Sequence, residues 1–123
     1  MLFRSTRAAT DDNLAADPTA SYVPVTLTPK DGFNRILDDH ARNLYQPTID
    51  KLFSFAPATM AKKIARANVQ QAFIFDTVFR HIKDYANPKM LCVGSYEDTA
   101  SMALQKMGYQ VEEVDPKIGR AHV

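Results

Sequence analysis

The sequence has one cysteine, Cys92, and no apolar run close to the about 20 residues that a membrane-spanning helix needs. A single cysteine excludes an internal disulfide framework. Cys92 and the three histidines show no metal-ligand spacing, so no metal site is expected. These absences predict a protein of a reducing, soluble compartment, which we interpret as cytoplasmic and without membrane association.

The chain also has almost no excess of one sign of charge, since 15 Lys and Arg residues stand against 14 Asp and Glu residues for a net charge of +1. This balance gives no broad attraction to polyanions, so nucleic acid is not an expected partner. The hydrophobic share of 46% is that of an ordinary globular chain. Its 123 residues are enough for one domain but not for two.

Residues 1–27 have neither helical nor strand periodicity and predict a flexible leader. Arg4 and Arg7 lie in a Ser- and Thr-containing stretch, as in targeting peptides. Asp11 and Asp12 follow, however, and targeting peptides are poor in acidic residues. We therefore do not expect a targeting signal.

Residues 28–88 predict a helical region. Thr28 is expected to cap a first helix, because its hydroxyl can accept hydrogen bonds from the next amides, and Pro29 suits the first helical position. Pro47 removes a backbone donor and predicts that this helix ends near Leu44 and that another begins. Five residues recur at helical spacing and are expected to form one buried stripe. They are Phe33, Ile36, Leu37, His40 and Leu44.

Pro57 is expected to open a further short helix. The most apolar candidate helix spans residues 68–86 and is apolar on more than one side, which predicts two packing neighbours. Asn87 and Pro88 are expected to stop it, because proline disfavours the helical region in the residue before it. Three aromatic side chains of this helix are interpreted as core: Phe73, Phe75 and Phe79.

The pattern then changes. Residues 90–93 form an unbroken apolar run that ends at Gly94 and predicts a strand buried on both faces. Helical spacing resumes over 99–107, and Gly108 is expected to form a left-handed cap. Residues 109–114 alternate as a second strand.

Strand, helix and strand over residues 89–117 predict one βαβ unit with parallel strands, so the fold class is α/β. Ligands of such sheets lie beyond the carboxyl ends of the strands, here at Gly94 and Asp115. Asp115 follows Gly94 by 21 positions. This is close to the roughly 20 positions that separate a glycine loop from the acidic residue that holds ribose hydroxyls.

Two stretches of this unit resemble a known family. They are Met90-Leu91-Cys92-Val93-Gly94-Ser95-Tyr96-Glu97-Asp98 and Val111-Glu112-Glu113-Val114-Asp115. Together they are similar to the opening of class I S-adenosylmethionine-dependent methyltransferases, over less than half of the chain. The resemblance implies a Rossmann-like fold and methyl transfer to an unidentified acceptor, with a helical N-terminal region before the first strand. It also implies S-adenosylmethionine contacts at Gly94, Ser95, Tyr96, Glu97, Asp98 and Asp115.

The loop after Gly94 helps to choose between cofactors. A pyrophosphate needs bare backbone, which glycines at the places of Tyr96 and Asp98 would provide. This loop instead brings a bulky ring and two carboxylates, those of Glu97 and Asp98. A carboxylate about 4 Å from a phosphate costs roughly 4 kcal/mol at an effective dielectric of about 20. S-adenosylmethionine has no phosphate and carries two positive groups that carboxylates attract. Its own carboxylate is expected to use free amides at the start of the helix over 99–107.

Each candidate residue also has a structural alternative. Asp98 is a good N-cap, and Glu97 suits the positive end of a helix. Tyr96 can be a packing residue, and Ser95 can serve only to shape its turn. Asp115 can be a turn residue at the end of a strand.

After Gly94 the chain has room for one βαβ unit of about 30 residues, whereas a doubly wound sheet needs several. We therefore expect a truncated fold. Residues 118–123, Ile-Gly-Arg-Ala-His-Val, are similar to one translated frame of a sequencing adapter and predict a non-native tail. The expected protein is the amino-terminal portion of a methyltransferase, inactive as this fragment and with an unknown catalytic base.

Two other functions stay open. A different Rossmann enzyme that uses NAD or a sugar nucleotide can share the same βαβ unit, since fold does not fix function. A non-enzymatic module can instead use the helical region, from Phe33 to Ile82, as a surface for a protein partner.

Overall fold

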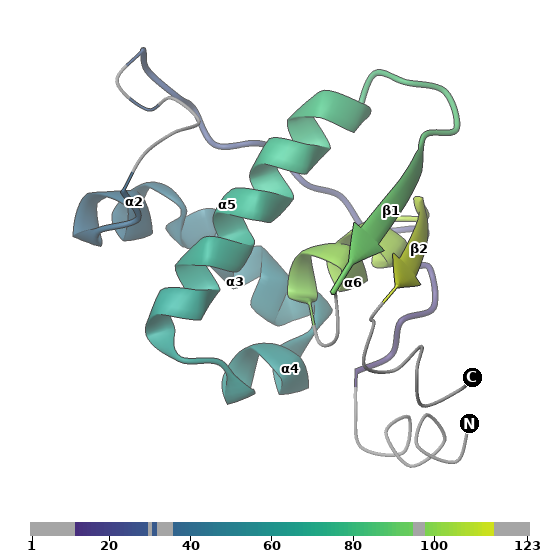
Figure 1. Ribbon diagram of the computed structural model, residues 1–123, viewed down its shortest axis with the longest axis horizontal. Helices are drawn as coiled ribbons and strands as arrows, with labels where there is room; N and C mark the ends of the chain where they lie inside the picture. The colour runs from purple at the N-terminus through teal and green to yellow at the C-terminus, as the bar shows by residue number, and fades with distance from the viewer. Residues whose placement is uncertain (1–11, 30, 32–35, 95–97, 115–123) are drawn as a thin grey trace.

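The computed structural model describes residues 12–29, 31, 36–94 and 98–114 (Figure 1). Within these residues, four helices come first and are followed by a strand, a helix and a second strand. Their bounds are α2 (Asp39–Leu44), α3 (Gln46–Phe55), α4 (Pro57–Lys62), α5 (Ala65–Ile82), β1 (Lys89–Val93), α6 (Thr99–Lys106) and β2 (Gln110–Val114). The helices and the small sheet give an α/β structure, as predicted.

The two strands pair in parallel, with Met90 opposite Val111 and Val93 opposite Val114. This confirms the strand, helix and strand unit. Met90 and Val111 pack against the core, whereas Leu91 and Val93 on the other face are 63% and 65% exposed. The prediction that β1 is buried on both faces is therefore wrong for the described part of the chain.

Gly108 ends α6 as predicted. Its φ is +93°, and its amide donates to the carbonyl of Gln105 at 2.9 Å. The Tyr109 amide reaches back to the carbonyl of Leu104 at 3.0 Å, which completes a Schellman motif. This cap turns the chain so that β2 can return beside β1.

Pro47 and Pro57 also act as predicted. Pro47 lies in the first turn of α3, directly after α2 ends at Leu44, and Pro57 is the first residue of α4. At both places the missing proline amide falls where a helix has no intrahelical acceptor for it.

The helix predicted to run from Pro29 to near Leu44 is not continuous, because residues 36–38 are not helical and α2 begins at Asp39. The side chain of Asp38 is its N-cap and accepts from the Ala41 amide at 3.0 Å. Thr28 donates to the Asp31 carboxylate, through its amide at 3.1 Å and its hydroxyl at 2.8 Å. The Asp31 amide donates back to the Thr28 carbonyl at 2.9 Å. The residues that would continue a helix from Thr28, 30 and 32–35, lie outside the described residues.

The buried stripe predicted for that helix is therefore wrong in part. Ile36 precedes the helix and is 81% exposed. His40 is 70% exposed, and its Nε2 lies 3.4 Å from an oxygen of the buried Asp31 carboxylate. Leu37 and Leu44 do pack against the core, whereas Phe33 lies outside the described residues.

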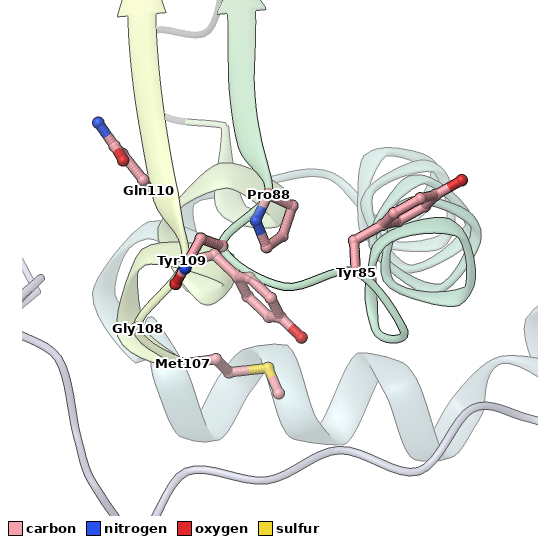
Figure 2. A pocket seen from close by; sticks show the side chains of 7 residues that line it. Tyr85, Pro88, Met107, Gly108, Tyr109 and Gln110 are labelled. Atoms are coloured by element: carbon pink, nitrogen blue, oxygen red, sulfur yellow. The ribbon is translucent and has the colours of Figure 1, made fainter.

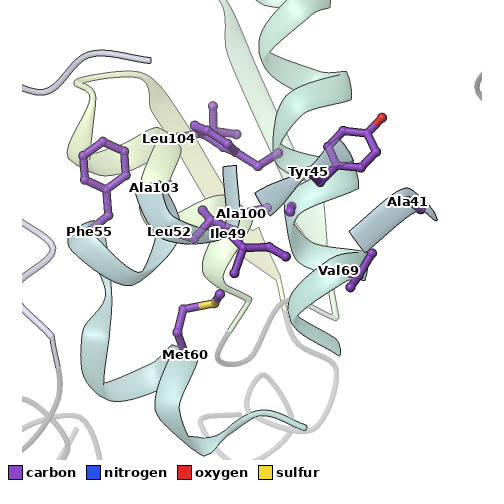
Figure 3. Close-up of a cluster of buried hydrophobic side chains, with 12 residues drawn as sticks. Ala41, Tyr45, Ile49, Leu52, Phe55, Met60, Val69, Ala100, Ala103 and Leu104 are labelled. Carbon is purple, nitrogen blue, oxygen red and sulfur yellow. The ribbon is translucent and has the colours of Figure 1, made fainter. Parts of the chain in front are cut away.

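The longest helix, α5, packs against both α3 and α6, which confirms the two predicted neighbours. It starts at Ala65, before the predicted residue 68, and ends at Ile82, before Asn87 is reached. Phe75 and Phe79 are core residues as predicted, and Phe73 is partly buried. Figure 3 shows the core between these helices. Its members are Ala41, Tyr45, Ile49, Leu52, Phe55, Met60, Val69, Ala72, Phe75, Ala100, Ala103 and Leu104.

Residues 12–29 contain no helix or strand, yet they lie against the helices as an extended strap (Figure 1). The carboxylate of Asp12 caps α4 by accepting from the amides of Ala58 and Thr59 at 2.8 and 2.9 Å. The Asp17 amide donates to the carbonyl of Lys106 at 2.8 Å. The strap thereby connects the start of α4 with the end of α6.

The centre of the strap is anchored on Asp76, a fully buried carboxylate of α5. Oδ1 accepts from the Tyr22 hydroxyl at 2.5 Å and from the Val25 amide at 3.2 Å. Oδ2 accepts from Nε of Arg80 at 2.6 Å, and Arg80 also donates to the Val25 carbonyl. The Tyr22 hydroxyl lies 2.7 Å from Oγ1 of the buried Thr48. Every oxygen of this buried carboxylate therefore has a partner, as a stable interior charge requires.

Of the helices that the structure describes, none is long and apolar enough to cross a lipid bilayer.

We predict that Asp76→Ala destabilises the fold by roughly 3 kcal/mol, because it leaves the Arg80 guanidinium and the Tyr22 hydroxyl without their acceptor. Urea unfolding followed by circular dichroism measures the change. Asp84→Ala is the matched control, since the side chain of Asp84 is 82% exposed and pairs with its neighbour Lys83. Equal stability of the two variants would contradict the anchoring role of Asp76.

Burial of Tyr22 and its hydrogen bond to Asp76 raise the pKa of the Tyr22 phenol above its ordinary value near 10. The unfolded chain therefore releases this proton more readily than the folded one, so Tyr22 contributes to the loss of stability as the pH rises above about 10. We predict that Tyr22→Phe lowers stability at neutral pH and flattens its decline at alkaline pH. Unfolding curves at a series of pH values test this, and an unchanged slope would contradict it.

Candidate functional site

The carboxyl ends of the two strands lie at one edge of the sheet, as their parallel pairing requires. The amide of Gly94, just after β1, donates to the carbonyl of Val114, the last residue of β2, at 2.5 Å. Of the six candidate residues, Gly94 and Asp98 are placed. The others lie outside the described residues: Ser95, Tyr96, Glu97 and Asp115.

Gly94 has a φ of +70°, in the left-handed region that favours glycine. A Cβ added there would meet no atom within 4 Å. The backbone conformation thus favours glycine here, and no described residue fills the space beside it.

Asp98 is the N-cap of α6, so the structural alternative for this residue is confirmed. Its Oδ2 accepts from the Ser101 amide at 3.1 Å and from the Ser101 hydroxyl at 2.7 Å. The Cys92 thiol contacts the same oxygen at 3.7 Å, which joins β1 to the start of α6. All of these donors reach Oδ2, so Oδ1 has no donor among the described residues.

Two amides in the first turn of α6 are already used by side chains, whereas a ligand carboxylate was expected to use the amides there. The Ala100 amide donates to Oε1 of Gln71, on α5, at 2.9 Å, and the Thr99 hydroxyl lies 3.2 Å from the same oxygen. The Ser101 amide is taken by Asp98. Nothing in the sequence pattern connects Gln71 with residues 28 and 29 positions away, so this contact was not predicted.

A pocket of about 400 Å³ lies at the opposite edge of the sheet (Figure 2). Its walls come from the turn before β1 and from the turn that leads into β2. Ligands of parallel sheets lie beyond the carboxyl ends, so this pocket is separate from the candidate site. The lining residues are Tyr85, Asn87, Pro88, Met107, Gly108, Tyr109 and Gln110.

Within the described ranges, no three His, Cys, Asp or Glu side chains gather in a way that could hold a metal ion. His81 and Arg66 are exposed.

Comparison with known proteins gives no relative for this chain, because no family model, curated protein or solved structure matches it.

We predict that Asp98→Ala destabilises the fold by about 1 kcal/mol, the usual effect of losing an N-cap. Asp98→Ser keeps a capping oxygen but removes the charge, so it should retain most of the stability. Urea midpoints of the two variants measure the difference. If both variants are as stable as the parent chain, the cap contributes nothing.

Proposed function

We propose that the chain is the cofactor-binding, amino-terminal portion of a class I methyltransferase. The observation that carries this proposal is the parallel βαβ unit, in which the backbone after β1 meets the end of β2 at the Gly94 to Val114 hydrogen bond. A crevice at this edge is where open parallel sheets bind nucleosides and related ligands.

The chemistry at the start of α6 favours S-adenosylmethionine over a dinucleotide. A pyrophosphate would sit on free amides at a helix N-terminus. Here the Ala100 amide is used by Gln71, and the Ser101 amide is used by the carboxylate of Asp98. A phosphate would therefore find few donors and a repelling charge. A sulfonium or an ammonium group would instead be attracted by the Asp98 carboxylate.

In this proposal Gly94 permits close approach of the ligand to the backbone, and Asp115 accepts hydrogen bonds from the ribose hydroxyls. Residues Ser95 to Asp98 surround the methionine part of the ligand. The methyl group then passes from the sulfonium to a nucleophilic acceptor atom in line with the bond that breaks. The acceptor and the group that orients it are left open.

We predict weak binding of S-adenosylmethionine to this chain, with amide NMR shifts at Gly94 and Val114. Asp115→Ala should abolish the shifts, because it removes the acceptor for the ribose hydroxyls. Glu112→Ala is the matched control, since Glu112 is an exposed carboxylate of β2. NAD at the same concentration should leave these amides unchanged. Shifts with NAD and none with S-adenosylmethionine would contradict the proposal and favour a dinucleotide enzyme.

A further inference from the structure

We propose that Gln71 is a positioning residue for the candidate cofactor site. This inference rests on the proposed function, because it concerns how the same site is kept in shape. Gln71 lies on α5, in the helical layer, and its side chain reaches the first turn of α6 in the βαβ unit. It is therefore a polar connection between the two parts of the structure.

The geometry of this contact is specific. One oxygen, Oε1, lies 2.9 Å from the Ala100 amide and 3.2 Å from the Thr99 hydroxyl. Thr99 is fully buried, and Ala100 is 2% exposed. The Ala100 amide belongs to the first turn of α6, where a helix offers no acceptor of its own. Without Gln71 this buried donor would lose its partner, which is costly in an interior.

Gln71 and Asp98 accept hydrogen bonds from different amides at the start of α6. Asp98 holds the Ser101 amide from the β1 side, and Gln71 holds the Ala100 amide from the α5 side. The first turn of α6 is thereby tied to both neighbours. Since Gly94 and Asp98 flank the candidate loop, a loose helix start would let Asp98 and its carboxylate shift relative to Gly94. Ligand binding would then have to order this turn, and the lost conformational entropy would lower the affinity.

A pair of near-isosteric substitutions separates the hydrogen bond from packing. Gln71→Met keeps the length of the side chain but removes the acceptor. Gln71→Glu keeps the acceptor and adds a charge that a helix N-terminus favours. Gln70→Met is the matched control, because Gln70 is the exposed neighbour on the same helix.

Two measurements are made on the whole chain: hydrogen exchange of the Ala100 amide without ligand, and S-adenosylmethionine affinity from NMR titration. For Gln71→Met we expect about fivefold faster Ala100 exchange, the effect of one lost hydrogen bond, and a similar loss of affinity. Gln71→Glu should restore both, and Gln70→Met should change neither.

The outcomes are distinguishable. Unchanged Ala100 exchange in Gln71→Met overturns the role of Gln71, whatever the parent chain binds. Faster exchange with unchanged affinity shows that Gln71 stabilises α6 without positioning the site, and this also overturns the inference. If the parent chain shows no S-adenosylmethionine binding, the proposed function fails and the positioning role fails with it, while the exchange data still report on the hydrogen bond itself.

Discussion

The parallel pairing of β1 with β2 is the constraint on which the candidate site depends. Two parallel neighbours cannot be joined by a tight turn, so the chain must cross back over the sheet. Here α6 makes this crossing and packs on one face, against α3 and α5. The pairing also fixes the register, which brings Gly94 beside Val114. The carboxyl ends of β1 and β2 therefore lie at one edge of the sheet because the strands run in the same direction.

The helical layer is organised by a different kind of interaction. Asp76 is buried, and two of its partners, Tyr22 and Val25, come from a strap more than 50 positions away in sequence. Such a network fixes where the strap crosses α5, because each buried polar atom requires its own partner. Gln71 lies on the same helix and reaches α6. One helix therefore connects the strap, the core and the first turn beside the candidate site.

The sequence was most informative where local chemistry decides the structure. Pro47, Pro57 and Gly108 act at the positions where their backbones predict helix boundaries. It was less informative where the decision is tertiary. The contacts of Tyr22 and Gln71 join residues far apart in sequence, and neither has a periodic signal. The apolar run of β1 predicts that Leu91 and Val93 are buried, yet no described element covers them.

The central claim is that an adenosine lies across the two strand ends, and intermolecular nuclear Overhauser effects test it most directly. With S-adenosylmethionine bound, the account predicts contacts from the ribose protons to the backbone of Gly94 and Val114. Contacts instead to Tyr85 or Tyr109, which line the pocket at the opposite edge, would contradict it. The absence of any contact at the Gly94 edge under saturating ligand would contradict it equally.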